Sequence, residues 1–119
     1  MKKKILVIDD EREIVNFLEN FLTRLNLVTI KAVTAKEATE LYLEHKPDGV
    51  FLDINMPDKD GLTLLKELKE INPAIKVIMI TAKDDRKTQD KAKRYGALDY
   101  ITKPLDLHEL AKKIEQYYL

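Results

Sequence analysis

The sequence has no cysteine, which excludes disulfides, thiolate metal sites and thiol catalysis and fits a reducing compartment. It has no serine, three glycines and four prolines, so it contains no flexible linker and no low-complexity tract. Its 21 basic and 21 acidic residues cancel, so no overall charge would steer the protein to nucleic acid or to an anionic membrane. Any chemistry that depends on charge must therefore be local.

Long apolar runs are missing as well. No stretch approaches the ~18 residues of a membrane helix. The apolar residues 5–8, which follow a basic start, are too few for a signal peptide. We therefore expect a cytoplasmic protein that makes no membrane contact. A chain of 119 residues suffices for one domain, which we expect to span 1–119.

Short apolar runs alternate with helical patterns along the whole chain. Unbroken apolar runs are typical of strands buried on both faces of a parallel sheet, whereas spacings of three and four are typical of amphipathic helices. The predicted strands are 5–8, 28–33, 49–52, 77–80 and 99–101. The predicted helices are 14–25, 34–45, 62–71, 84–95 and 106–114. This alternation predicts an α/β fold, a three-layer α/β/α sandwich around a five-stranded parallel sheet.

Local signals refine three of the helices. Thr34 and Glu37 have the spacing of a capping box at the start of the second helix. The fourth predicted helix has only Ala92 and Tyr95 as core contacts, so we expect it to be loosely held. The apolar stripe of the last helix consists of Leu107, Leu110, Ala111 and Ile114.

Chemically active side chains stand where four of the strands end. The first strand is followed by Asp9 and Asp10, the third by Asp53, the fourth by Thr81, and the fifth leads into Lys103. Sites in such sheets form in the crevice beyond the carboxyl ends of the strands. If the first and third strands are neighbours, three carboxylates meet there, and their repulsion requires a cation. Mg²⁺ fits, because it prefers oxygen ligands and is usually held by one or two carboxylates plus phosphate oxygens.

Asp53 is the best candidate for a nucleophile toward phosphorus, because an aspartate can form an aspartyl phosphate. It stands alone at a strand end, whereas the adjacent Asp9 and Asp10 have the character of metal ligands. Mg²⁺ on one side and the Lys103 ammonium on the other would neutralise the charge on the phosphoryl oxygens. The Thr81 hydroxyl would donate to one of these oxygens only after transfer.

Each of these residues has an ordinary explanation when it is taken alone. Asp10 and Glu13 have the spacing of a helix capping box, and for that pair alone the cap is favoured. Thr81 at a strand end is more often a turn residue, and Lys103 before a proline is more often a solvated lysine. The site hypothesis depends on the combination, since four strands present complementary groups at one edge of the sheet.

These residues resemble the receiver domains of two-component response regulators. Residues 5–11 are similar to the acidic first-strand motif of that family, and residues 53–61 are similar to its phosphoacceptor loop. Thr81-Ala82 and Lys103-Pro104 resemble its other two signatures. The likeness spans the whole chain and implies a flavodoxin-like sheet with the strand order 2-1-3-4-5.

The resemblance implies a phosphorylation-activated signalling switch, a phosphoacceptor domain and not an enzyme. Asp53 would accept the phosphoryl group from the phosphohistidine of a histidine kinase or of a phosphotransfer protein in a phosphorelay. Thr81 and Lys103 would contact the transferred group. The implied Mg²⁺ ligands are Asp9, Asp10, Asp53 and the backbone carbonyl of Asn55.

The resemblance also implies how the phosphoryl group is reported. Thr81 would move toward it, and Tyr100, which matches the switch aromatic of the family, would enter the vacated space. An ordinary packed strand aromatic explains Tyr100 equally well. The fourth helix, the fifth strand and the last helix would then act on a downstream output protein or domain. The bond between Lys103 and Pro104 is expected to be cis.

Some positions depart from the family pattern, and others bear on the lifetime of the phosphoryl group. Asn26 and Ala35 stand where relatives often have glycine, and Asn55 and Lys83 match positions that govern the lifetime of the phosphoryl group. The cognate kinase, the output and the presence of a longer parent chain stay open.

Other functions fit the sequence less well, and one of them stays open. A nucleotide-binding flavodoxin would need a loop rich in Gly, Ser or Thr after the first strand, where this chain has three acids at 9–11. A calcium loop built on Asp58, Asp60, Gly61 and Glu67 has most of the EF-hand spacing, but its first ligand position would be Met56, and a strand precedes it where a helix is required. A receiver-like module that binds partners without phosphorylation stays open, and neither Mg²⁺ chelation nor Asp53→Asn would affect it.

Overall fold

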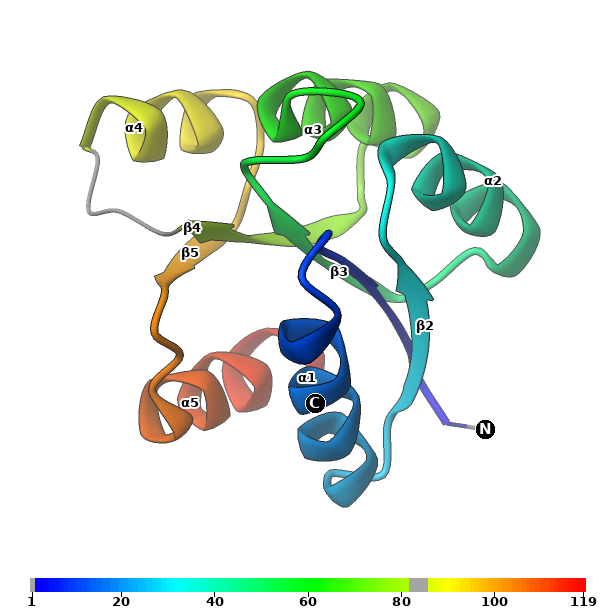
Figure 1. Cartoon of the computed structure of the whole chain (residues 1–119), viewed down its shortest axis with the longest axis vertical. Helices are drawn as coiled ribbons and strands as arrows, with labels where there is room; N and C mark the ends of the chain where they lie inside the picture. The colour runs from blue at the N-terminus through cyan, green and yellow to red at the C-terminus, as the bar shows by residue number, and fades with distance from the viewer. Residues whose placement is uncertain (1, 82–85) are drawn as a thin grey trace.

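Five parallel strands form the central layer, and helices cover both faces of the sheet (Figure 1). The computed structural model describes residues 2–81 and 86–119. The strands are β1 (Lys4–Ile8), β2 (Val28–Ala32), β3 (Gly49–Asp53), β4 (Lys76–Thr81) and β5 (Asp99–Thr102). The helices are α1 (Arg12–Arg24), α2 (Ala35–His45), α3 (Gly61–Ile71), α4 (Arg86–Arg94) and α5 (Leu107–Tyr118). The strand order is β2-β1-β3-β4-β5, so the predicted fold class and strand order are confirmed.

Each face of the sheet buries its own apolar cluster. In β1, Ile5 and Val7 point toward α1 and α5, whereas Leu6 and Ile8 point toward the other face, which α2, α3 and α4 cover (Figure 1). Successive strand residues alternate between the two faces, and here both faces are covered. This is why the central strands are unbroken apolar runs. Because β1 and β3 are parallel neighbours, they end together at one edge of the sheet.

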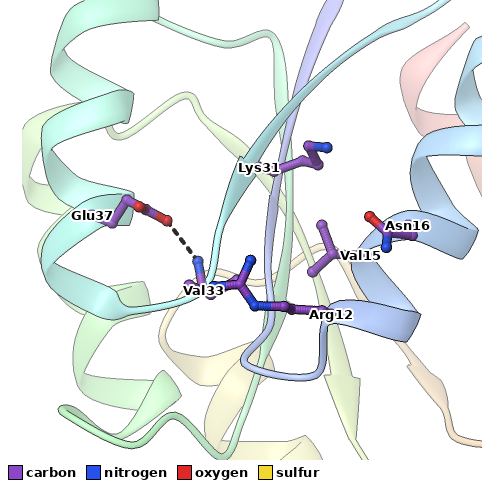
Figure 2. Close-up of a pocket in the computed structure, with 6 residues that line it drawn as sticks. All are labelled: Arg12, Val15, Asn16, Lys31, Val33 and Glu37. Atoms are coloured by element: carbon purple, nitrogen blue, oxygen red, sulfur yellow. Dashed lines mark hydrogen bonds between the residues drawn. The ribbon is translucent and has the colours of Figure 1, made fainter.

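The start of α2 has the predicted capping box. The Thr34 hydroxyl accepts a hydrogen bond from the Glu37 N–H at 3.1 Å. The Glu37 carboxylate accepts one from the Val33 N–H at 2.8 Å, which Figure 2 shows as a dashed line. Two N–H groups that a helix start leaves free are thus satisfied by side chains of the same segment.

The capping box expected from Asp10 and Glu13 is wrong. Helix α1 begins at Arg12 with Glu11 as its N-cap residue, and no side chain caps it. The chain turns one residue later than the spacing suggests because the Asp9 carboxylate accepts a hydrogen bond from the Glu11 N–H at 2.9 Å. Asp10 is therefore available to the edge of the sheet and does not cap the helix.

The last helix packs differently from its predicted stripe. Leu107, at the first position of α5, is 52% exposed, because the helix starts at the rim of the sheet. Tyr118, which the predicted stripe omits, is 2% exposed. Its ring meets the Phe51 ring edge to face at 5.4 Å, and its hydroxyl donates to the Val50 carbonyl. The end of α5 is thus anchored in the middle of the sheet.

Helix α4 buries little, as predicted. Its buried residues are Ala92 and the polar Gln89, which the sequence-based prediction omits, while Tyr95 packs against the same core cluster. The first two residues of the predicted helix, together with Ala82 and Lys83, lie outside the described residues. Among the residues that the structure describes, no helix combines the length and the apolar character needed to cross a membrane.

Candidate functional site

Three carboxylates meet at the carboxyl edge of the sheet. Asp9 and Asp10 follow β1, and Asp53 is the last residue of β3, which pairs with β1. One oxygen from each of the three carboxylates lies within 4.8 Å of the others. Asp9 and Asp53 are buried and Asp10 is exposed. The structure therefore brings together the acidic residues that the sequence analysis singled out, in a cluster that opens to solvent on the Asp10 side.

Lys103 forms ion pairs with the acidic residues of this cluster. Its Nζ lies 3.0 Å from an Asp9 oxygen, 2.9 Å from a Glu11 oxygen and 3.7 Å from an Asp53 oxygen. Burial lowers the pKa of Lys103, but Glu11 and Asp9 more than offset this, so the pKa is raised overall. The lysine stays charged. The peptide bond to Pro104 is cis, as the resemblance implies.

One ammonium does not neutralise three carboxylates. Burial and the neighbouring charge of Asp9 raise the pKa of Asp53 to about 7, although Lys103 and the backbone N–H of Asn55 act in the opposite direction. Burial also raises the pKa of Asp9, against the hydrogen bond from Glu11 and the charge of Lys103. Full ionisation of the cluster is therefore costly in the protein alone, because buried like charges repel each other in a medium of low dielectric constant.

The cluster has the chemistry of a site for a hard divalent cation. Its side-chain oxygens come from Asp9, Asp10 and Asp53, and carboxylate oxygens are the ligands that Mg²⁺ prefers. The raised pKa values show that additional positive charge would stabilise the ionised cluster. Asn55 lies beside it, since its backbone N–H acts to lower the pKa of Asp53 against the effect of burial.

Thr81 and Lys103 are held next to each other at the end of the sheet. Thr81 ends β4, is 5% exposed, and pairs with Thr102 of β5. Its carbonyl accepts a hydrogen bond from the backbone N–H of Lys103 at 2.7 Å. Asp53 pairs with Ile80, so Thr81 stands one position beyond the phosphoacceptor candidate on the neighbouring strand.

Tyr100 lies outside the acidic cluster, on β5 between two helices. Its ring faces the Nζ of Lys93 on α4 at 5.8 Å and the Nζ of Lys113 on α5 at 5.3 Å. Lys113 also contacts the Tyr100 carbonyl and the Asp99 carboxylate. The half-buried ring thus sits at the junction of α4, β5 and α5.

Two residues near the cluster are assigned no role by the sequence-based prediction. Glu11 forms an ion pair with Lys103. Its position directly after two aspartates is the sequence feature that could have indicated this role. Asp58 binds the start of α2, and this contact joins residues more than twenty positions apart, which no local pattern indicates.

Close approach of the backbone also shapes the site. A Cβ on Gly61, the first residue of α3, would lie 2.4 Å from the carbonyl oxygen of Asp53. Only glycine lets α3 begin this close to the phosphoacceptor candidate. The loop between them is short, and the Asp60 carboxylate caps α3 by accepting from the Leu62 N–H at 3.0 Å.

A separate hollow lies between α1, β2 and α2. Its volume is about 260 Å³, and Figure 2 shows the residues that line it: Arg12, Val15, Asn16, Lys31, Val33 and Glu37. None of the three clustered carboxylates belongs to this lining. The acidic cluster at the carboxyl edge of the sheet is therefore distinct from this hollow.

Comparison with known proteins agrees with the fold and the motifs. Sporulation initiation phosphotransferase F of Bacillus subtilis is 32% identical over 117 residues, which cover 98% of this chain and 94% of that protein. The transcriptional regulatory protein KdpE of Staphylococcus aureus is 38% identical over 96% of this chain, which spans only 49% of that protein. A chain in the crystal structure of the CheX–CheY–BeF3–Mg²⁺ complex of Borrelia burgdorferi superposes with a TM-score of 0.93 and 30% identity, covering 98% of this chain and 90% of that one.

The sequence model of the response regulator receiver domain matches residues 5–115, which is nearly the whole chain. This match, together with a relative that is aligned over almost its full length, identifies the signalling class of the domain. Receiver domains of this class are regulatory domains that are phosphorylated on an aspartate. The chain belongs to the receiver domain family of two-component response regulators.

Proposed function

We propose that this domain is switched by a phosphoryl group on Asp53, taken with Mg²⁺ from the phosphohistidine of a histidine kinase or a phosphotransfer protein. The observation that carries the proposal is the position of Asp53, buried at the end of β3, with Asp9 and Asp10 on one side and Lys103 at 3.7 Å. Lys103 and a cation held by Asp9 and Asp10 would together balance the negative charge on the phosphoryl oxygens during transfer to this carboxylate.

Transfer makes one bond and breaks one bond. An Asp53 oxygen bonds to phosphorus as the phosphorus–nitrogen bond of the phosphohistidine breaks. The electron pair of that bond returns to the imidazole nitrogen, which can then bind a proton. Mg²⁺, when bound by Asp9, Asp10, Asp53 and the Asn55 carbonyl, supplies positive charge to the phosphoryl oxygens. Lys103 supplies the same from the other side. In this proposal the domain promotes its own phosphorylation.

The response is proposed to run through Thr81 and Tyr100 to the surface formed by α4, β5 and α5. Thr81 is buried at the end of the strand next to that of Asp53. A small conformational change would bring its hydroxyl to the phosphoryl group. Tyr100 is half-buried between α4 and α5, so a change in its position would alter the surface that these two helices expose. A downstream protein or domain that recognises this surface would read the change.

Thr81→Ala is expected to separate phosphorylation from the response. The variant should accept as much phosphoryl group as the wild type, because the nucleophile and the cation ligands are intact. Most of the change in amide hydrogen exchange that phosphorylation causes in β5 and α5 should be lost, because the hydroxyl that senses the group is gone. An unaltered exchange response in Thr81→Ala would exclude this role of Thr81.

Intact-mass measurement after incubation with a small phosphodonor tests the proposed chemistry. We expect the wild type with Mg²⁺ to gain the mass of one phosphoryl group. The gain in mass should be absent when Mg²⁺ is chelated, and it should also be absent in the Asp53→Asn variant. If the gain persists in Asp53→Asn, another residue is the acceptor, and if the wild type gains nothing, the partner-binding module without phosphorylation becomes the better description.

A further inference from the structure

The loop after Asp53 is tied to a helix that lies far from it in the sequence. Asp58, in the segment between β3 and α3, reaches the start of α2. One of its carboxylate oxygens accepts a hydrogen bond from the Ala35 N–H at 2.9 Å, and the other accepts one from the Lys36 N–H at 3.1 Å. These N–H groups lower the pKa of the Asp58 carboxyl below its usual range.

The bonds of Asp58 complete a helix start that is already partly capped. Thr34 and Glu37 satisfy the N–H groups of Glu37 and Val33, and the Thr34 carbonyl accepts from Ala38. The N–H groups of the first two helical residues have no acceptor within a helix, since every helix leaves its first turn unpaired. A carboxylate is favoured there by the helix dipole as well. Asp58 is thus a cap that comes from another element.

Other ties of the same loop lead to α3 and to β4, where the Ile80 carbonyl accepts a hydrogen bond from the Ile54 N–H at 3.0 Å. Lys59 forms an ion pair with Glu67 at 2.8 Å, Asp60 caps α3, and the Gly61 N–H donates to the Ile54 carbonyl at 2.8 Å. Asp58 adds a tie to α2 on the other flank. Within the loop, Asn55 forms an antiparallel β-bridge with Asp60, two residues after Asp58. The position of Asn55 near Asp53 is therefore set by a loop that is anchored to α2, α3 and β4.

We infer that Asp58 is a positioning residue, which fixes the loop from Ile54 to Asp60 against α2 so that the backbone of Asn55 stays at the acidic cluster. The inference rests on the proposed function, because the Asn55 carbonyl is one of the proposed Mg²⁺ ligands. Asp58 does not itself touch the cluster. Groups that orient metal ligands typically change metal affinity by 10- to 100-fold when they are replaced.

The test compares Asp58→Ala with a matched helix-cap variant, Thr34→Ala. Both remove a side-chain cap from the start of α2, but Thr34 makes its bond within the helix segment and does not hold the loop. Calorimetric titration with Mg²⁺ should show an affinity roughly tenfold weaker in Asp58→Ala and unchanged in Thr34→Ala. Asp58→Asn, which keeps one acceptor oxygen, should fall between Asp58→Ala and the wild type.

A second readout needs no metal. Amide hydrogen exchange of residues 54–56 in the metal-free protein should be faster in Asp58→Ala and unchanged in Thr34→Ala, because only the first variant frees the loop. Exchange that is equal in Asp58→Ala and the wild type overturns the inference. Equal effects of Asp58→Ala and Thr34→Ala also overturn it, since Asp58 would then act only by stabilising α2. A wild type that binds no Mg²⁺ contradicts the proposed function, while the exchange result still decides the role of Asp58.

Discussion

Replacing Asp53 with asparagine is expected to stabilise the metal-free domain while it abolishes phosphorylation. The Asp53 carboxyl is buried beside Asp9, and its pKa in the folded protein is raised to about 7 from an ordinary value of 3.8. Its negative charge therefore costs free energy in the fold. Removing that charge should raise the free energy of unfolding at pH 8 by about 2 kcal/mol, a value that allows for the coupling to Asp9.

The pH dependence of this gain follows from the direction of the shift. A carboxyl whose pKa is higher in the folded than in the unfolded protein costs nothing below the unfolded value, since both states are protonated there. The cost grows as the pH rises toward about 7 and is constant above that value. Denaturant unfolding should therefore show the gain of Asp53→Asn at pH 8 and little gain near pH 4.

An exposed aspartate gives the matched control. Asp90→Asn, on the surface of α4, should change the free energy of unfolding by less than about 0.5 kcal/mol at either pH. If Asp53→Asn destabilises the metal-free protein at pH 8, the carboxylate is a stabilising partner in a satisfied network, and the account of a strained acidic cluster is wrong.

Tyr118→Ala is expected to have the largest effect on stability. The ring is 2% exposed, packs edge to face on Phe51, and fills the space next to Gly49, where a Cβ would lie 2.5 Å from a ring carbon. Truncation leaves a cavity between α5 and the sheet and removes the hydroxyl that donates to the Val50 carbonyl. Loss of a buried aromatic side chain costs about 4 kcal/mol, which denaturant unfolding would measure.

The neighbouring tyrosine is the control for this substitution. Tyr117 is only half-buried and its hydroxyl donates to Asp99 at 3.0 Å, so Tyr117→Ala should cost about 1 kcal/mol. Tyr118 contacts the start of β3, whereas Asp53 stands at its end, so the folded fraction of Tyr118→Ala should still accept a phosphoryl group. Equal losses in the two variants would contradict the anchoring role of Tyr118.

The sheet was predictable because its strands are buried on both faces. In β1 and β3 every side chain after the first residue of β1 is buried, so the apolar runs stand out from the chain around them. The same logic predicted the position of the carboxylates. Once parallel strands are accepted, residues that follow β1 and β3 have to meet at one edge, and Asp9 and Asp53 do.

Contacts that depend on distant residues were not predictable. Nothing near Asp58 in the sequence indicates that it caps α2, because its partners lie more than twenty residues earlier. The Asp10 and Glu13 cap failed for a related reason, since the Asp9 carboxylate binds the Glu11 N–H and sets the turn. Tyr118 continues the spacing of four from Leu110 and Ile114, but its place in the core depends on the small Gly49 opposite it.

The central claim is that the carboxylates of Asp9, Asp10 and Asp53 share one divalent cation. Thermal unfolding of the wild type over a series of Mg²⁺ concentrations tests it most directly, because a ligand that binds only the folded protein raises the midpoint with its concentration. We predict a midpoint that rises with Mg²⁺ in the wild type and stays constant in the Asp9→Asn, Asp53→Asn double variant. A wild-type midpoint that does not respond to Mg²⁺, or an equal rise in the double variant, would contradict the claim.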